Sequence, residues 1–280
     1  MNNILQDRAM LVSLTISQWT NRRHDKKASQ QVEQANNAKQ AGRFHKVLVS
    51  KDALEAIAKI ASQARDFHYH LTMPWGNNGE RLLPSTLFMK YTDAMSDFKL
   101  KFSVEVDRFV RDYPQLVADA QLRLGSLYNA ADYPDSRSIR DRFGIHTDFV
   151  PVPAAEDFRV QLNDEYVDKI RQEITSKVTQ RQREAVFDCW RRVREVVEHI
   201  HERLADKDKV FRDTLISNAK DLVEILPALN FTNDENLNQI ASEVNAILVA
   251  PERLRTDETL RSDVASKAAD ILARLPTCLA

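Results

Sequence analysis

Glycine is scarce in this sequence, with five residues among 280. Phosphate-binding loops need several glycines at fixed spacing, and neither Gly-x-x-x-x-Gly-Lys-Ser/Thr nor Gly-x-Gly-x-x-Gly occurs. The Gly-x-Ser-x-Gly and His-Glu-x-x-His motifs of esterases and zinc proteases are absent as well. These absences exclude the usual nucleotide hydrolases and the easily recognised esterases and zinc proteases. We therefore expect no catalytic residues and no cofactor.

Cysteines and long apolar runs are also few. The two cysteines, Cys189 and Cys278, lack the short spacing that indicates a zinc site. No apolar run approaches the roughly 20 residues that a membrane span requires. The first residues lack the basic-then-apolar layout of a secretory signal. We therefore expect a cytoplasmic protein that does not contact a membrane.

Charge is abundant and unevenly distributed. Hydrophobic residues make up 43% of the chain and charged residues 29%, which is typical of a globular, helix-rich protein. The net charge is -1, yet Arg8 through Lys46 contains eight basic and two acidic residues, a net charge of +6. From Ala205 onward there are nine basic and thirteen acidic residues, a net charge of -4. This asymmetry indicates a basic functional surface near the N-terminus, or two solvated faces of opposite sign.

Two long amphipathic helices are predicted from apolar residues that recur every three or four positions. The first seam begins after Ser85 and ends at Pro114; it comprises Phe88, Tyr91, Met95, Phe98, Phe102, Val106, Phe109 and Tyr113. The second begins after Asn163 or Asp164, a suitable N-cap, and continues to Leu204. A helix of that length measures about 60 Å at 1.5 Å per residue. We expect the two helices to pack antiparallel as a long hairpin.

The remaining elements predict a mainly α fold with a minor α+β part. Alternating residues predict strands over 10–19, 144–152 and 158–162, which would form a small antiparallel sheet. Shorter helices are predicted from Asp25 to about Gly42, from Ser50 to Phe67 and from Gln115 to about Ala130. We expect an N-terminal region over 1–205 and a C-terminal helical bundle over 206–280. Alternatively, the C-terminal helices pack back on the hairpin.

The segment Ala64–Pro84 gathers two histidines, two glycines, two prolines and a tryptophan, and we expect it to be irregular. In an extended chain, His68 and His70 would lie on the same side and, with Asp66 or Glu80, could hold a divalent cation. The alternative is that one histidine packs in the core and the other bonds a loop carbonyl. Because a catalytic metal site normally needs three protein ligands, we expect no metal here.

Basic residues near the N-terminus, with an aromatic residue close by, are typical of a surface that faces phosphates. Trp19 or Trp75 could stack on an unpaired base. The candidate residues for binding nucleic acid or a partner are Trp19, Arg22, Arg23, Lys26, Lys27, Arg43, Lys46, His68, His70, Trp75 and Arg81. Alternatively, Trp19 closes the core at the end of its strand.

Several motifs resemble those of an uncharacterised domain family from phages and conjugative elements. They are Trp19 with Arg23-x-Asp25-Lys26, Ala41-Gly42-Arg43-x-x-Lys46, His68-Tyr69-x-x-Thr72-x-Pro74-Trp75, Arg81-Leu82-Leu83-Pro84, Tyr113-Pro114, Asp132-Tyr133-Pro134 and Asp157-Phe158-Arg159-Val160. The resemblance extends to about Leu204. It implies no activity, but such genes tend to lie near those for a cobaltochelatase-like AAA+ ATPase and single-strand recombination proteins. It implies the host-cell cytoplasm if the protein is phage-encoded.

Three hypotheses follow. The first is a non-enzymatic protein of a phage or mobile element that binds single- or double-stranded DNA, or a partner that handles DNA. The second is an adaptor or oligomeric scaffold whose long helices dock on an AAA+ ATPase or form a homo-oligomer. The third, which we favour least, is a metal-dependent enzyme built on Asp66, His68, His70, Glu80 and Arg81.

Overall fold

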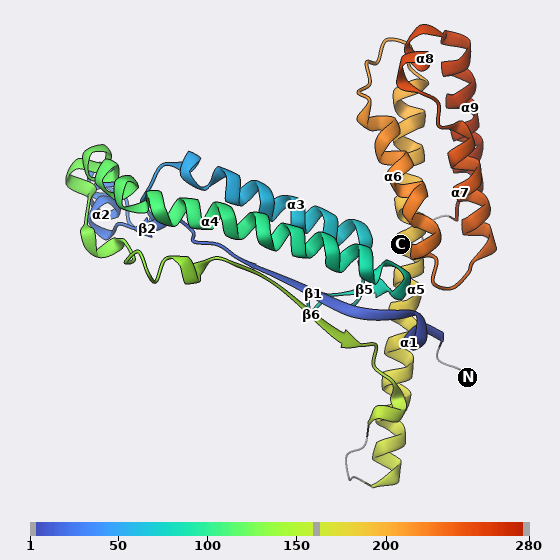
Figure 1. The fold of residues 1–280 in the computed structure, drawn as a ribbon, viewed down its shortest axis with the longest axis horizontal. Coiled ribbons are helices and arrows are strands. Elements are labelled where there is room, and N and C mark those ends of the chain that lie inside the picture. The colour runs from blue at the N-terminus through green and yellow to red at the C-terminus, as the bar shows by residue number, and fades with distance from the viewer. Residues whose placement is uncertain (1–3, 159–162, 277–280) are drawn as a thin grey trace. The chain divides into compact units, whose positions relative to one another are not determined.

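The computed structural model describes residues 4–158 and 163–276 (Figure 1). It is mainly helical, with a small antiparallel sheet of four strands and a second sheet of two strands, which confirms the expected fold class. The α-helices are α1 (Ile4–Arg8), α2 (Lys26–Ala35), α3 (Glu55–Leu71), α4 (Phe88–Leu124), α5 (Asp164–Leu204), α6 (Thr214–Leu229), α7 (Glu235–Ile247), α8 (Pro251–Thr256) and α9 (Glu258–Arg274). The strands are β1 (Ala9–Ser17), β2 (Arg22–His24), β3 (His45–Val47), β4 (Met73–Pro74), β5 (Glu80–Pro84) and β6 (Gly144–Pro151).

The described residues divide into two compact units. The first comprises residues 4–13, 69–89, 148–158 and 163–276, and the second comprises residues 14–68 and 90–147. All of α5 belongs to the first unit, whereas α4 belongs to the second from Lys90 onward. The expected packing of these two helices against each other is therefore not a feature of either unit. None of the described helices is both long and apolar enough to cross a membrane.

Helix α5 is the scaffold of the first unit. The Asn163 side chain caps its start by accepting a hydrogen bond from the Glu165 N–H at 3.1 Å, as predicted. Its buried residues recur every three or four positions and are Ala185, Asp188, Cys189, Val193, Val197, Ile200 and Leu204. Helices α6 and α9 pack along this half of α5, and α7 packs on both of them (Figure 1). The C-terminal helices thus share a unit with α5, and the expected boundary at 205/206 does not coincide with the observed division.

The segment Ala64–Pro84 is more regular than we expected: it is helix or strand except at Thr72 and over residues 75–79. Helix α3 continues to Leu71, because the seam of Ile57, Ala61 and Ala64 continues through a buried histidine, His68. Strands β4 and β5 then form an antiparallel hairpin in which Met73 faces Leu82 and Pro74 faces Arg81. Leu71, Met73, Leu82 and Leu83 are all buried. The hairpin is therefore part of the core of the first unit.

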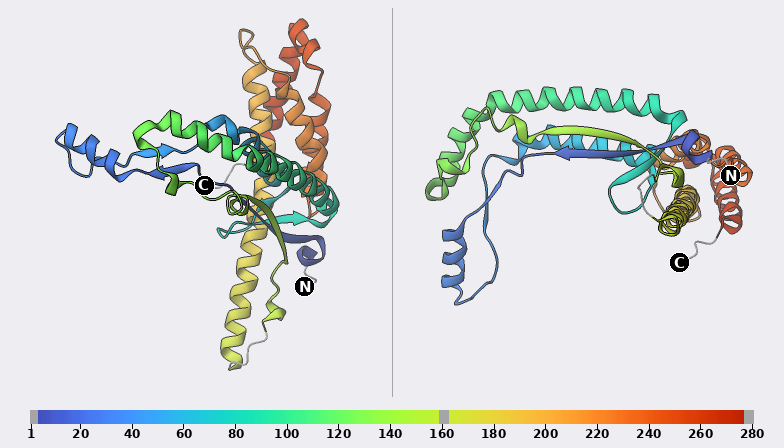
Figure 2. Two further views of the ribbon diagram at one scale, coloured as in Figure 1. Left: turned by 60° about the vertical axis from the view of Figure 1, so that its left-hand side comes forward. Right: turned by 90° about the horizontal axis from the view of Figure 1, so that it is seen from below.

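Helices α3 and α4 lie side by side in the second unit (Figures 1 and 2). The ring of Phe67 on α3 lies 6.3 Å from the ring of Tyr91 and 5.8 Å from that of Phe98, both on α4. The predicted seam of α4 is confirmed, since Tyr91, Met95, Phe102, Val106, Phe109 and Tyr113 are buried. The predicted end at Pro114 was wrong, because Pro114 lies inside α4. Proline removes one backbone hydrogen bond, and burial along the seam on both sides offsets that loss.

The four-stranded sheet has the order β4-β5-β1-β6. Strands β1 and β6 confirm the predictions over 10–19 and 144–152. The partners of β1 within the first unit come from the hairpin: β5 pairs antiparallel with it from Ala9 opposite Pro84 to Ser13 opposite Glu80. Of the third predicted strand, Phe158 is not in a strand and residues 159–162 lie outside the described residues.

Candidate nucleic-acid interface

A small basic element, which we term the basic lobe (residues 21–48), projects from the second unit. Strands β2 and β3 pair antiparallel, with Arg22 opposite Val47 and His24 opposite His45. Helix α2 follows β2 directly because Asp25 caps it, accepting a hydrogen bond from the Ala28 N–H at 3.0 Å. Figure 2 shows α2 and the chain returning from it to β3 side by side. The predicted helix and cap are confirmed, although the helix ends at Ala35 rather than near Gly42.

The returning chain, residues 36–44, is tied to α2. Asn37 and Gln40 adopt left-handed backbone conformations, with φ of 49° and 54°. Glu33 Oε1 accepts a hydrogen bond from the Ala41 N–H at 3.3 Å, and Ser29 Oγ accepts one from the Phe44 N–H at 3.0 Å. These bonds give the basic lobe a defined shape although few of its side chains are buried.

Most cations of the basic lobe are exposed. Between residues 22 and 46 there are seven basic and two acidic residues, a net charge of +5. The exposed basic side chains are Arg22, Arg23, Lys26, Lys27, Lys39 and Arg43. Arg23 Nε also lies 3.3 Å from Asp132 Oδ1, a pair that is screened because Arg23 is largely exposed. The surface of the basic lobe therefore carries an excess of positive charge.

Lys46 has a structural role instead of the ligand contact that we predicted. Its side chain is only 5% exposed, and its Nζ lies 2.7 Å from Asp132 Oδ2 and 3.2 Å from Asp25 Oδ2. It also donates a hydrogen bond to the Leu127 carbonyl at 2.6 Å. Burial would lower the pKa of the Lys46 ammonium, but hydrogen bonds to Asp132 and Asp25 outweigh it and raise that pKa above 10.5. Lys46 is therefore a charged internal anchor.

The Asp25 carboxylate is held by the same network. The pKa of the Asp25 carboxyl is lowered from 3.8, first by the hydrogen bond from the Ala28 backbone and then by Lys46. Asp25 is thus ionised at neutral pH and occupied by internal donors. It neutralises Lys46 and not the exposed cations of the basic lobe.

The predicted base-stacking tryptophans are buried, which contradicts that role for both. Trp19 is 9% exposed, and its ring lies 6.1 Å from the Phe109 ring and 6.0 Å from the Tyr113 ring. Trp75, in the first unit, is 1% exposed. Phe44, which is 40% exposed, is the aromatic residue that the basic lobe presents to solvent. This surface therefore offers little aromatic area for stacking on bases.

The two histidines of the Ala64–Pro84 segment do not share a site. Because α3 is helical through Leu71, residues two apart face different sides, which overturns the extended geometry we expected. His68 is buried, and its Nδ1 lies 2.8 Å from the Tyr91 hydroxyl. The His70 carbonyl accepts a hydrogen bond from Arg192 at 2.8 Å. Across the described residues, no three His, Cys, Asp or Glu side chains are grouped so as to hold a metal ion.

Arg81 is fixed within the first unit. Its Nε donates to Thr72 Oγ1 at 2.6 Å, its Nη2 donates to the Thr72 carbonyl at 3.0 Å, and its guanidinium lies 4.7 Å from the centre of the Tyr69 ring. Burial is the main cause that lowers the pKa of Arg81 from 12.5, followed by the charge of Arg192. Arg81 thus stabilises the turn after α3, and it belongs to a different unit from the basic lobe.

Sequence reasoning missed Arg192, which closes the carbonyl end of α3. It donates to the carbonyls of Tyr69, His70 and Thr72, and its Nε lies 2.8 Å from Asp188 Oδ2. The available signal was Asp188, an acid on the apolar seam of α5 with an arginine four residues later. A buried acid in such a seam predicts an internal cation.

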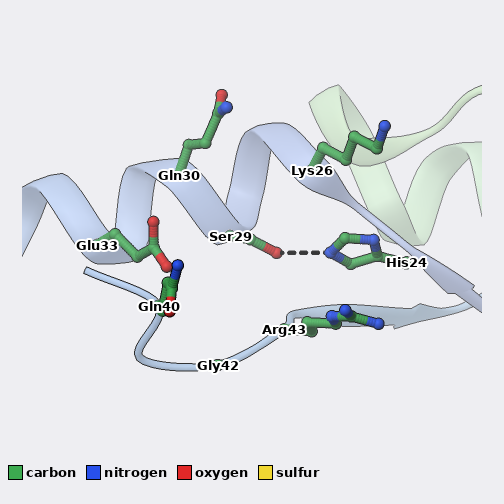
Figure 3. A pocket seen from close by; sticks show the side chains of 8 residues that line it. All are labelled: His24, Lys26, Ser29, Gln30, Glu33, Gln40, Gly42 and Arg43. Atoms are coloured by element: carbon green, nitrogen blue, oxygen red, sulfur yellow. Dashed lines mark hydrogen bonds between the residues drawn. The ribbon is translucent and has the colours of Figure 1, made fainter. Parts of the chain in front are cut away.

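Sequence reasoning also missed a hollow in the basic lobe, of about 520 Å³ (Figure 3). It lies between α2 and the chain that returns from it. The residues that line it are His24, Lys26, Ser29, Gln30, Glu33, Gln40, Gly42 and Arg43. The hollow forms when residues 36–44 fold back on α2, so no contiguous motif predicts it.

Comparisons of the chain with protein-family models, with curated proteins and with solved structures found no match. The resemblance to the family from phages and conjugative elements therefore stays a prediction.

Proposed function

We propose that the protein binds nucleic acid, with the basic lobe contacting the phosphate backbone. One observation carries this proposal: six exposed cations lie on a short element whose buried cation, Lys46, is already paired with Asp25 and Asp132. Such an excess of positive charge attracts polyanions over roughly the 10 Å of the Debye length at 0.1 M salt. The non-enzymatic character of this function agrees with the absent catalytic motifs.

The expected mode of binding is independent of base sequence. Each lysine or arginine that contacts a phosphate releases condensed counterions, and this term carries no base information. Phe44 gives little stacking area, so single- and double-stranded DNA of one sequence are expected to bind comparably. Three motif residues of the family resemblance, Arg23, Lys26 and Arg43, lie exposed in the basic lobe, which supports a role in DNA handling.

The test is the binding of labelled single- and double-stranded oligonucleotides at low salt, measured by fluorescence anisotropy. The variant R22Q/R23Q/K26Q/K27Q is expected to lose at least about tenfold in affinity because four phosphate contacts disappear. The matched control, K59Q/R65Q/R111Q/K220Q, removes two exposed lysines and two exposed arginines from other elements. Equal losses in both proteins, or no binding by the unmodified chain at low salt, would contradict the proposal.

A second candidate function is assembly through the first half of α5. None of residues 164–184, all of which the structure describes, is buried. Val167, Ile170, Ile174 and Val178 nevertheless form a half-buried apolar stripe at spacings of three and four. The short turn of Ala155–Asp157 also contacts α5. Tyr166 at the start of the helix is exposed as well. This stripe supports docking on an AAA+ ATPase or on a second copy of the chain.

Size measurement tests this second candidate. Light scattering is expected to show an oligomer, or purification is expected to recover the ATPase together with the chain. I170E/I174E should abolish either result, while the circular dichroism spectrum stays unchanged. The control Q172E/S176E adds the same charges to the other side of α5. A strictly monomeric chain that does not co-purify with the ATPase would remove this candidate and leave the nucleic-acid proposal intact.

A further inference from the structure

We infer that the hollow of the basic lobe seats one phosphate of the bound strand, with Lys26 and Arg43 as its ligands and His24 beside it. This inference rests on the proposed function and adds a defined subsite to it. The three residues come from three segments: His24 from β2, Lys26 from the first turn of α2 and Arg43 from the returning chain. A subsite assembled in this way differs from a diffuse basic surface, because it has a position and a shape.

The lining of the hollow separates its cationic side chains from its acidic one. In Figure 3, His24, Lys26 and Arg43 lie toward one end of the hollow, while Glu33 and Gln40 lie together toward the other. Glu33 is the acid of this lining, and its Oε1 accepts the Ala41 N–H at 3.3 Å, which directs it to the returning chain. The cationic end therefore suits a phosphate, and the opposite end leaves polar groups for the adjoining sugar.

The hydrogen-bonding chemistry of the cationic end also fits a phosphate. Lysine and arginine side chains are donors only, and a phosphate oxygen accepts several charge-assisted hydrogen bonds. The hollow, at about 520 Å³, falls within the range of about 300–1,000 Å³ that holds small ligands, so a phosphate with its sugar can enter. Lys26 and Arg43 are both exposed, and in Figure 3 the Lys26 side chain extends away from the returning chain, so it must change rotamer to meet a phosphate held by Arg43.

One serine joins the walls of the hollow. Ser29 Oγ donates its hydrogen to the Asp25 carbonyl at 2.7 Å and accepts from the Phe44 N–H at 3.0 Å. Because that single hydrogen is used, the contact with His24 Nε2 at 3.1 Å requires His24 to donate (Figure 3). The His45 ring lies 5.4 Å from the His24 ring on the neighbouring strand. These contacts hold His24 in place beside Lys26 and Arg43, where its ring can report a bound phosphate.

The basic lobe offers a matched pair of variants. K26Q/R43Q removes one lysine and one arginine that line the hollow, whereas R22Q/K27Q removes one of each that do not. Both variants change the net charge equally. Inorganic phosphate, titrated at constant pH and ionic strength against chloride, is the probe, and the Cε1–H signal of His24 in NMR spectra is the readout.

Phosphate is expected to shift the His24 signal in the unmodified chain and in R22Q/K27Q, but not in K26Q/R43Q. The signal is also expected to shift with an oligonucleotide, whose affinity falls at least about threefold further in K26Q/R43Q than in R22Q/K27Q. Equal oligonucleotide affinities for the two variants, or an oligonucleotide that binds without shifting His24, would overturn the subsite and leave the proposed function standing. Absence of any oligonucleotide binding would instead remove the proposed function.

Discussion

Lys46 Nζ lies 2.7 Å from Asp132 Oδ2, and this ion pair joins strand β3 to the turn of Ala130–Asp132. Asp25 completes the network at 3.2 Å from the same ammonium. The network fixes the basic lobe to the rest of the second unit. It also divides the lobe's cations by role, since Lys46 is enclosed while Arg22, Lys26 and Lys27 are exposed.

Replacing Lys46 is expected to reduce stability more than it reduces surface charge. K46Q leaves the Asp25 and Asp132 carboxylates near one another without their shared cation, which should lower the free energy of unfolding by about 2 kcal/mol. K27Q, at an exposed position, should change it by less than about 0.5 kcal/mol. Urea unfolding followed by circular dichroism measures both values. Equal stability of the two variants would show that the Lys46 network contributes nothing.

The stability that Asp25 contributes should depend on pH. Because the pKa of the Asp25 carboxyl in the folded chain is below 3.8, its charge contributes stability that is fully present above that value. This contribution is lost as the pH falls through the lower, folded pKa. D25N keeps a capping side chain but removes the charge. Its melting temperature should lie below that of the unmodified chain at pH 6, and the gap should narrow at pH 3. A gap that stays constant would contradict this assignment.

Replacing Arg192 should reduce stability even when the new residue is lysine. Its guanidinium bonds three carbonyls at the end of α3 and the buried Asp188, a set that one ammonium cannot reproduce. R192K should therefore lower the free energy of unfolding by about 2 kcal/mol. R183K, at an exposed position of the same helix, is the control and should change it by less than about 0.5 kcal/mol. Guanidinium-induced unfolding of the two variants makes the comparison, and similar midpoints would refute the capping role.

Tryptophan fluorescence checks that Trp19 and Trp75 do not meet bases. Both are buried, whereas Trp190 on α5 is half-buried. Acrylamide should quench Trp190 most strongly, so W190F should lose most of the quenchable emission. Adding an oligonucleotide to W190F should leave the remaining emission unchanged, because stacking on a base requires an exposed ring. Strong quenching of W190F by the oligonucleotide would restore the stacking role.

Sequence patterns over a few residues predicted the helices and caps that depend on neighbouring residues alone. The seams of α4 and α5 and the caps Asp25 and Asn163 follow from spacing and side-chain chemistry over a few residues, and all appear in the structure. The predicted helix end at Pro114 was wrong, because packing along the long apolar seam outweighs the low helix propensity of proline. The helical structure around His68 was not predicted, because a histidine occupies a buried position of the seam where an apolar residue is usual.

The candidate site was less predictable because it depends on contacts that are distant in sequence. The pattern identified the exposed cations Arg22, Arg23, Lys26, Lys27 and Arg43. It could not assign Lys46 to the interior, since the partner that holds it, Asp132, belongs to a turn far along the chain. The hollow likewise depends on residues 36–44 closing over α2 through Ser29. Charge composition thus predicted a basic surface near the N-terminus. Tertiary contacts determine which of its basic residues are exposed for binding.

We propose that the exposed cations of the basic lobe neutralise phosphates. The slope of log affinity against log salt concentration for a double-stranded oligonucleotide measures this, because the slope counts the phosphate contacts. If R22Q/R23Q/K26Q/K27Q removes four contacts, its slope should be shallower than that of the unmodified chain by about 3.6. The control K59Q/R65Q/R111Q/K220Q should keep the original slope. Parallel lines for the unmodified chain and the basic-lobe variant would contradict the claim.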